Sequence, residues 1–541
     1  MPPRAPSCPD PAPHEGERRR AARGVAWGGV ESAASAMVGL VLTPLVVRSC
    51  GLAGLGLWAA SWSLAHTTNL LDLGVGASYT RFTSQAIAQS DVRALNRTLA
   101  AGTGFHVVLV AVLAVLALAL GPVLLGIVAP PGPLAAQART VFACTLATVL
   151  LRTLLSAFRS VAAGAQRIDL LGRIGAAVSV LEGIGAASAL ACGWGLAGMA
   201  FNSLFWGASA SVAEACVAHR LVPGLRIVPF QTGREEWREL LSFGLRLQVV
   251  RMSEILGAHV PRLALAAGAG LAPAGVYDLG ARVAGALQIA ALPLPVIQPL
   301  AGRLAARGER GRLQSLLERA TRYVALLALP CAALVLLDAE AVLRAWTGRD
   351  VAAASATTAR LLSLALLCGY VFSPLRLVLR GCGRPGPEAL GALCGTLIHL
   401  SLAVALAPVL GASGVAASAL AGAVLSAGIV VVGAGRAADL LASGTGRALR
   451  GPLLSAGAGF VAAAALRMCV PGWGVPFATR IDALYRLLPE VFVLGGAALG
   501  VAFMTGALGR DEASALVSAF LPRRVRRSVD SAAVLGAGGR P

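Results

Sequence analysis

The sequence of 541 residues contains no lysine, so arginine supplies all 46 basic residues. Charged residues of both signs are scarce, at 13% of the chain, whereas a soluble globular domain carries about 25%. Apolar residues make up 57%, and the mean hydropathy is +0.74. This lack of charge excludes an ordinary soluble protein and indicates a protein embedded in a membrane.

The motifs of enzymes and metal sites are also missing. The ten cysteines lie mostly inside apolar segments and form no C-x-x-C pair. There is no G-x-S-x-G or H-E-x-x-H sequence, and a Walker loop would need a lysine. We therefore expect no catalytic residue, no metal and no cofactor. The net charge of +20 comes from arginines spread between apolar stretches, so we expect no nucleic-acid partner.

Long apolar segments dominate the rest of the chain. A helix that spans a bilayer needs about 20 mainly apolar residues. By that measure the sequence predicts an all-α membrane protein with about fourteen spanning helices, of which the ninth is short. Their expected ranges are 25–47, 53–74, 99–121, 138–160, 173–193, 197–218, 240–267, 274–299, 322–337, 354–379, 388–409, 413–434, 452–470 and 484–507.

The arginines predict how these helices are oriented. Residues 1–24 are proline-rich and then basic, without a signal-peptide core, and residues 508–541 are basic. We expect both to be cytoplasmic tails, the first disordered. With that orientation most arginines are cytoplasmic, as the positive-inside rule requires. The expected outer loops carry only Arg48, Arg139, Arg262, Arg344, Arg349, Arg480 and Arg486. We therefore expect a multi-pass protein of the inner, cytoplasmic membrane.

Four short sequences recur in order at an almost constant offset. GLAGLGLW at 51–58 matches GLAPAGVY at 270–277, an offset of 219. The other pairs are AQSDVRALNRTL (88–99) with ARGERGRLQSLL (306–317), GAQR (164–167) with GCGR (381–384), and GLAGMAFNSL (195–204) with GASGVAASAL (411–420). Offsets that drift only from 219 to 216 indicate a duplication of six helices. An even number of helices makes the two copies parallel.

This duplication predicts the domain organisation. We expect an N-terminal lobe at 25–218, a cytoplasmic linker at 219–239 and a C-terminal lobe at 240–434. Two further helices then occupy 435–507. The matched octets would be the same outer turn in each lobe.

Several motifs resemble those of polysaccharide flippases, the O-antigen (Wzx-type) branch of the MOP exporter superfamily. They are Pro44 followed by GLAGLGLW, LDLGVG at 71–76 and TRFTSQAIAQSDVRALNRTL at 80–99. AWTG at 345–348 and RGCGRPG at 380–386 continue the pattern. The resemblance implies two lobes around a cationic cavity that opens alternately to either side. It implies a polyprenyl-diphosphate-linked oligosaccharide as substrate, the lipid bilayer as partner, and polysaccharide polymerases and glycosyltransferases as neighbours in the pathway.

Ionisable side chains inside spanning helices are costly, so they mark pathways or internal ion pairs. On the expected helix 240–267, one polar face of about 140° contains Arg251, Glu254, His259 and Arg262. The next helix adds Asp278 and Arg282, and helix 138–160 adds Arg152. We interpret the arginines, with His259, as a cationic lumen, because guanidinium groups bind phosphate in bidentate fashion.

A structural interpretation of the same charges stays open. Arg251 could pair with Glu254 and Asp278 with Arg282, which would only stabilise packing, and Arg262 could extend to the membrane surface. Glu31, Asp72, Glu254 and Asp278 are candidates either for such charge pairs or for ion coupling.

The expected helix 53–74 has a stripe of aromatic and polar residues. Trp58, Trp62, His66 and Asn69 share one face, together with Asp72. Aromatic faces beside hydrogen-bonding groups suit a sugar, so these four residues are candidate glycan contacts; packing between helices is the alternative.

Three rival functions remain. A lipid II-type flippase also fits fourteen helices. A MATE-like cation-coupled drug antiporter would have an acidic lumen and, by the pattern of that family, twelve helices. A membrane glycan polymerase would need a large outer loop, and the outer loops here are short.

Overall fold

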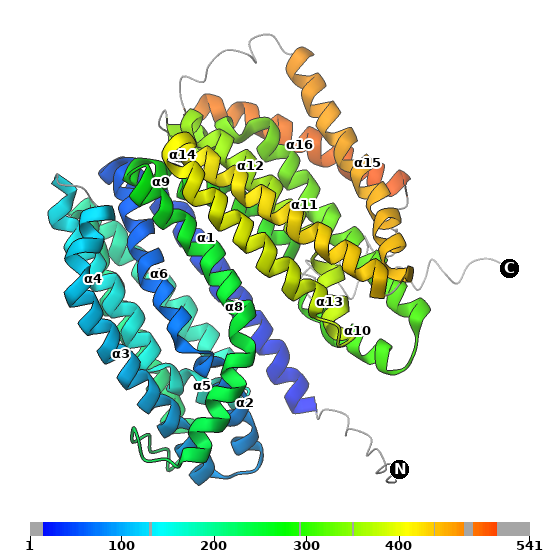
Figure 1. The fold of residues 1–541 in the computed structure, drawn as a ribbon. Coiled ribbons are helices and arrows are strands. Elements are labelled where there is room, and N and C mark those ends of the chain that lie inside the picture. The colour runs from blue at the N-terminus through cyan, green and yellow to red at the C-terminus, as the bar shows by residue number, and fades with distance from the viewer. Residues whose placement is uncertain are drawn as a thin grey trace. The chain divides into compact units, whose positions relative to one another are not determined.

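The computed structural model describes residues 15–128, 133–291, 294–348, 351–437, 439–469 and 480–505. The regular elements of this part of the chain are all helices, as Figure 1 shows. In chain order they are α1 (Glu15–Thr67), η1 (Thr68–Asp72), α2 (Val75–Ala88), α3 (Val92–Val128), α4 (Pro133–Leu154), α5 (Ser156–Gly164), α6 (Ile168–Ala191), α7 (Gly195–Leu221), α8 (Arg234–Gly268), α9 (Leu271–Ala284), η2 (Gly285–Ala291), η3 (Leu294–Val296), α10 (Ile297–Ala306), α11 (Arg310–Thr347), α12 (Val351–Val371), α13 (Ser373–Gly381), α14 (Gly386–Ala437), α15 (Asp439–Cys469) and α16 (Arg480–Met504).

These helices account for the predicted spans. Among the described residues, nine stretches are long and apolar enough to cross a membrane, and there are ten if the bent pair Leu271–Ala291 with Leu294–Ala306 forms one span. Two of the nine, Ala26–Asp72 and Gly386–Gly435, each contain two of the predicted helices. The two other predicted helices coincide with α7 and α8, which are not among these stretches. The all-α membrane fold is therefore confirmed, while the total of fourteen stays a prediction.

The repeat is visible in the backbone. Left-handed φ angles occur at Gly51 and Gly270, at Ser90 and Gly308, at Gln166 and Gly383, and at Gly195 and Gly411. Each pair lies within or at the edge of a matched pair of sequences. The two residues of a pair are separated by the same offset as the two sequences. A residue with positive φ ends or kinks a helix, and glycine adopts that conformation without steric cost. The matched sequences are thus matched helix boundaries.

The turns after α2 and α10 show the same correspondence in their hydrogen bonds. The amide of Asp91 donates to the carbonyl of Ala86 at 3.0 Å, and the amide of Glu309 donates to Leu304 at 3.1 Å. Both bonds close a helix across five residues, as in the Schellman motif. The same helix ending therefore follows two segments that are 218 residues apart.

The two matched octets contact each other. A Cβ atom on Gly56 would collide with the backbone carbonyl of Leu271 and lie 2.9 Å from the amide of Gly275. A Cβ atom on Gly275 would collide with the carbonyl of Leu52 and lie 3.1 Å from the amide of Gly56. Gly56 and Gly275 are equivalent in the repeat, so the contact between α1 and α9 is reciprocal. Glycine is required at both positions because the two backbones touch.

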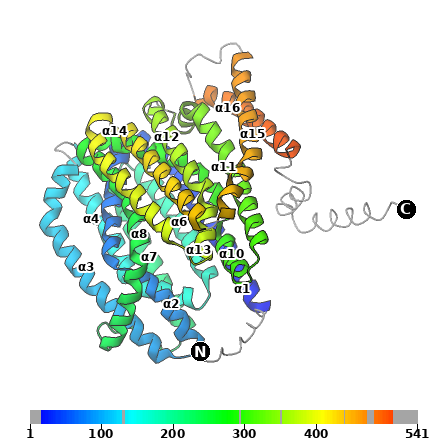
Figure 2. The same cartoon turned by 45° about the vertical axis from the view of Figure 1, so that its right-hand side comes forward.

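By packing, the chain divides into two compact units. Unit 1 contains Met1–Leu279 and Thr396–Ser418, and unit 2 contains Gly280–Gly395 and Ala419–Pro541. In unit 1, α1 packs against α6 and α8, and α7 packs against α4 and α6 (Figure 2). The cut between the units differs from the predicted lobe boundary at 219–239, because α8 packs with the N-terminal helices. The lobes inferred from the repeat stay a prediction.

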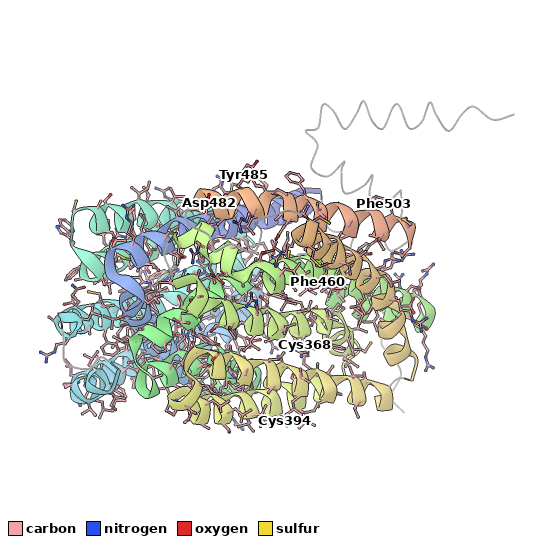
Figure 3. The ribbon with its side chains drawn as sticks, turned by 90° about the horizontal axis from the view of Figure 1, so that it is seen from above. Cys368, Cys394, Phe460, Asp482, Tyr485 and Phe503 are labelled. Carbon is pink, nitrogen blue, oxygen red and sulfur yellow. The ribbon has the colours of Figure 1, made fainter. Side chains whose placement is uncertain are left out.

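In unit 2, α11 is the central helix. It packs against α12, α15 and α16. Arg467 of α15 binds Asp338 of α11, and its Nε donates to Oε1 of Glu490 of α16 at 2.8 Å. Figure 3 shows α15 with Phe460 and α16 with Tyr485 and Phe503 along this side of unit 2. One arginine thus ties the last two described helices to α11.

Candidate functional site

A break in the first long helix positions the candidate site. The helix α1 continues into the 3₁₀ turn η1, and then Leu73 and Gly74 adopt left-handed φ angles of 49° and 76° before α2 begins. A left-handed leucine is strained, which makes this a specific feature of the fold. The expected helix 53–74 ends within the sequence LDLGVG, where the structure has this break, and α2 follows at once.

Asp72 holds the break together. Its Oδ2 accepts a hydrogen bond of 3.1 Å from the amide of Gly76 in the first turn of α2. The first amides of a helix have no partner within the helix, and a carboxylate there is stabilised by the helix dipole. Asp72 therefore belongs to the beginning of α2 as much as to the end of η1.

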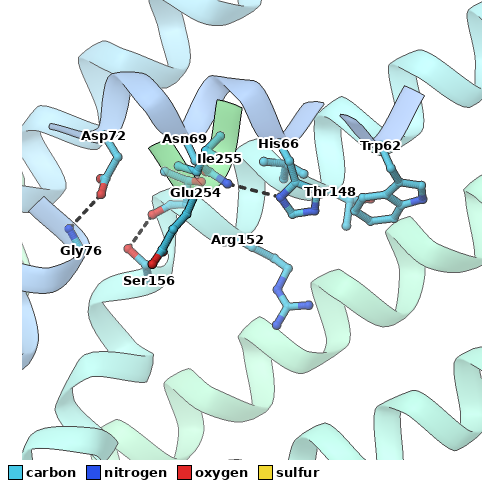
Figure 4. Close-up of a pocket in the computed structure, with 12 residues that line it drawn as sticks. Trp62, His66, Asn69, Asp72, Gly76, Thr148, Arg152, Ser156, Glu254 and Ile255 are labelled. Carbon is cyan, nitrogen blue, oxygen red and sulfur yellow. Dashed lines mark hydrogen bonds between the residues drawn. The ribbon is translucent and has the colours of Figure 1, made fainter. Parts of the chain in front are cut away.

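Beside the break lies a pocket of about 520 Å³, which Figure 4 shows in close-up. All of its lining residues belong to unit 1. They come from α1 and η1, from α2, from the α4–α5 region and from α8: Trp62, His66, Asn69, Asp72, Gly76, Thr148, Val149, Arg152, Thr153, Ser156, Glu254 and Ile255. The predicted stripe of helix 53–74 thus meets Arg152 and Glu254 in one cavity.

One wall of the pocket continues a column of aromatic rings. Trp58 and Trp62 lie edge to face with centroids 6.0 Å apart, and Trp62 stacks on His66 at 5.4 Å. His66 stacks in turn on His259 of α8, also at 5.4 Å. Asn69 lies 3.2 Å from Nδ1 of His66 and so fixes its ring. The structure therefore brings His259 to the aromatic stripe of α1.

Arg152 is the described arginine in the pocket wall. Its side chain is exposed and, among the side chains that the structure describes, has no ion-pair or hydrogen-bond partner. Glu254 across the pocket is also exposed and has no partner among the described side chains. Figure 4 shows both groups directed into the cavity. The pocket therefore offers one cation and two carboxylates, Glu254 and Asp72, to a ligand.

A buried histidine that the sequence analysis did not select lies behind Asp72. His106 of α3 is fully buried, and its Nε2 lies 2.6 Å from Oδ1 of Asp72. The ring of Tyr79 lies edge-on to His106 at 5.6 Å. The only signal in the sequence is a single histidine within an apolar helix, which more often reflects packing.

The other predicted charges lie elsewhere. Arg262 donates from Nε to Oδ1 of Asp278 at 3.1 Å and lies over the ring of Tyr277 at 5.6 Å. Arg262 thus forms an ion pair beside α9 and does not simply extend to the membrane surface. Arg282 lies on α9 within unit 2 and is exposed. The side chain of Arg251 lies outside the described residues, so the cationic lumen stays a prediction.

Glu31 is separate from this pocket. It lies on α1 against Gly175 of α6, where a Cβ atom on the glycine would collide with its carboxylate. Two further carboxylates have partners: the buried Glu214 binds Arg159 at 2.6 Å, and the half-buried Glu182 accepts from Ser203 at 2.5 Å. Among the described residues, no group of three His, Cys, Asp or Glu side chains could hold a metal ion.

Comparison with known proteins adds independent information. Residues 110–355 match the family model described as "Polysaccharide biosynthesis protein". No curated protein matches the sequence at a significant level. The fold resembles that of the lipid II flippase MurJ in an inward closed conformation, with a TM-score of 0.65 at 10% identity, over 88% of this chain and 98% of that one.

Two further solved structures share the fold. A multidrug resistance MATE family transporter in an inward-facing conformation gives a TM-score of 0.59 at 15% identity, over 76% of this chain and 98% of that one. A MOP superfamily transporter from Pyrococcus furiosus gives 0.53 at 16% identity, over 78% and 96%.

The apolar helices indicate a multi-pass membrane protein, and its fold is that of the MurJ and MATE transporter structures. The motif resemblance to polysaccharide flippases is supported by this fold and by the family match over residues 110–355.

Proposed function

We propose that this protein is a flippase that moves a polyprenyl-diphosphate-linked oligosaccharide across the cytoplasmic membrane by alternating access. The observation that carries the proposal is the pocket of unit 1, where an aromatic wall meets Arg152, Asn69 and two carboxylates. The match to a polysaccharide-biosynthesis family and the fold of a lipid II flippase support it.

The chemistry of the pocket suits a sugar. The ring of Trp62 provides an apolar face for the C–H groups of a pyranose, and Asn69, Asp72 and Glu254 provide acceptors and donors for its hydroxyl groups. A cavity of about 520 Å³ is of the size used for small organic ligands. We assign the glycan of the substrate to this pocket.

Arg152 supplies the charge that the proposal needs. A guanidinium group binds a phosphate or a sugar carboxylate through paired hydrogen bonds. Since Arg152 is exposed in the pocket without a described partner, it is available to the diphosphate or to an acidic sugar. Arg251 and Arg282 remain our further candidates for contacts with the diphosphate.

A lipid II-type flippase is the second candidate, and the TM-score of 0.65 with the lipid II flippase favours it over a drug antiporter. Both candidates are transporters of lipid-linked sugars, so neither requires catalysis by this chain. We further propose an inner-membrane location with both termini cytoplasmic, and polymerase and glycosyltransferase proteins as functional neighbours.

Complementation tests the proposal. The gene is expressed in one strain that lacks its O-antigen flippase and in another that lacks its lipid II flippase. We expect the wild type to rescue the first and Arg152→Ala to lose most of that rescue. Arg173→Ala is the matched control, because Arg173 is an exposed arginine of α6 that lies over Trp27 and outside the pocket.

The possible outcomes separate the candidates. Rescue of only the lipid II defect would assign the chain to the second candidate. Full rescue by Arg152→Ala at equal protein level would show that the pocket does not bind the substrate. In that case the triple variant with Arg251→Ala and Arg282→Ala tests the remaining arginines.

A further inference from the structure

His106 is fully buried, although its imidazole ring is polar and one of its two nitrogens lacks a hydrogen-bond partner among the described atoms. It is 0% exposed, and its Nδ1 has no hydrogen-bond partner among the described atoms. Its Nε2 lies 2.6 Å from Oδ1 of Asp72, so the two groups share a hydrogen bond. A buried ring nitrogen without a partner is costly, and such costs recur at functional sites.

Asp72 connects this histidine to the pocket. The aspartate side chain is 14% exposed and lines the cavity, whereas the imidazole is 1% exposed. The second carboxylate oxygen accepts from the amide of Gly76 at the beginning of α2. That amide and the helix dipole stabilise the anionic form of Asp72. Water in the pocket therefore reaches the carboxylate but not the ring.

We propose that Asp72 and His106 form a proton-binding site that is loaded from the pocket. A hydronium ion in the pocket gives one proton to the pair and leaves as water. The proton passes through the Asp72 carboxylate to Nε2 of the ring, which then has N–H bonds at both nitrogens and a positive charge, while the carboxylate regains its negative charge. The pair thus changes from a net charge of −1 to 0, and release to water reverses the step.

The location of the pair gives this proton a mechanical consequence. Asp72 ends η1 immediately before the left-handed Leu73 and Gly74, and His106 belongs to α3. Neutralising a buried charge lowers the cost of enclosing it within the membrane. Binding of a proton therefore favours the closed arrangement of η1 against α3, and its loss favours opening at the break. Only this consequence rests on the proposed transport function.

Other ionisable groups surround the pair and must be distinguished from it. His66 of α1, Arg152 of α4 and Glu254 of α8 line the same pocket as Asp72, and Tyr79 of α2 contacts the ring of His106. The side chains of Arg246 and Arg251 on α8 lie outside the described residues. A test therefore has to observe His106 itself.

Nuclear magnetic resonance of the full chain, labelled with ¹⁵N in its six histidines, observes it directly. The signals of His106 are those that disappear in His106→Gln. We expect them to change in the wild type when the pH is varied between about 5 and about 9, the range in which histidine side chains in general exchange protons. In Asp72→Asn the change should be lost, because the carboxylate that stabilises the imidazolium is gone.

His399 provides the matched control. It is also buried in a helix, and its Nδ1 lies 3.0 Å from Oγ of Ser418. The substitution His399→Gln should leave the His106 signals and their pH response unchanged. His106 signals that do not respond to pH in the folded wild type, or that respond identically in Asp72→Asn, would overturn the proposal.

A transport assay tests the consequence. Liposomes containing the protein and a fluorescent polyprenyl-diphosphate-linked disaccharide are given a pH gradient. We expect the gradient to stimulate flipping by the wild type and by His399→Gln, and the stimulation to be lost in His106→Gln while the basal rate remains. Stimulation that persists in His106→Gln would show that the proton acts elsewhere. If the wild type moves no lipid, the proposed function fails, and the resonance experiment still decides the proton site.

Discussion

The side chain of Trp62 has two possible roles, packing between helices and binding of a ligand, and a substitution can distinguish them. It is half-buried, stacks on His66 and also lines the pocket, so it could serve the helices or a ligand. An aromatic contact with a ligand contributes about 0.5–1.5 kcal/mol beyond the area it buries. A role in binding therefore predicts a change in affinity without a large change in stability.

For Trp62→Ala we expect roughly tenfold weaker apparent binding of a lipid-linked oligosaccharide, since about 1.4 kcal/mol corresponds to a factor of ten. Binding is measured with purified protein by quenching of intrinsic fluorescence, and thermal unfolding is measured in parallel. Trp194→Ala is the control, because Trp194 is 69% exposed and lies outside the pocket. An equal loss in both variants would show that Trp62 has no specific contact with substrate.

The sequence predicted part of this site at the level of residues. A helical wheel placed Trp58, Trp62, His66 and Asn69 on one face, because local periodicity is enough for residues on one helix. The pairing of Asp72 with His106 depends on the packing of η1 against α3, across 34 positions of sequence. No local pattern reports such a contact.

The helices were predictable from hydropathy, but their breaks were not. The expected ninth helix ended at 337, because Asp338 interrupts the apolar run. In the structure Asp338 has non-helical angles (φ −123°, ψ 26°) inside α11, which continues to Thr347. Arg467, a residue far along the chain, binds the carboxylate and allows the helix to pass. A charge that ends a span in sequence analysis can thus be neutralised by tertiary structure.

The reciprocal contact of Gly56 and Gly275 determines how closely α1 and α9 approach. A side chain at either position must separate the two backbones, since the collision is with main-chain atoms. We expect Gly56→Val to reduce transport strongly. In a chain whose only cysteine is Cys50, six residues away on α1, we also expect the substitution to increase the reactivity of that cysteine. Reactivity is measured with a thiol reagent that does not cross membranes.

Gly28→Val on the same helix is the control for this substitution. A Cβ atom on Gly28 meets nothing within 4 Å, so the same change in helix propensity occurs without a collision. Unchanged transport and unchanged Cys50 reactivity in Gly56→Val would contradict the close contact of the two octets.

At the scale of the whole molecule, the arginine distribution and the repeat depend on the same count of helices. Both require α7 to cross the membrane, although it is not among the stretches that meet the criterion of length and apolarity in the described part of the chain. If α7 did not cross, every helix after it would be inverted. The arginines of the following loops would then lie on the outer side, contrary to the positive-inside rule.

Two native cysteines test this point. Cys192 precedes α7, Cys216 lies near its other end, and both side chains are exposed. We expect a thiol reagent that cannot cross membranes to label a chain with Cys192 as its only cysteine in intact cells. A chain with only Cys216 should be labelled after the cells are opened and not before.

Because an exposed cysteine within a span could also react poorly, a chain with only Cys469, expected on the outer side, provides a second positive reference. Labelling of Cys192 and Cys216 from the same side would remove α7 from the count of spans. It would also place the two termini on opposite sides of the membrane, because an odd number of spanning helices would then lie between them.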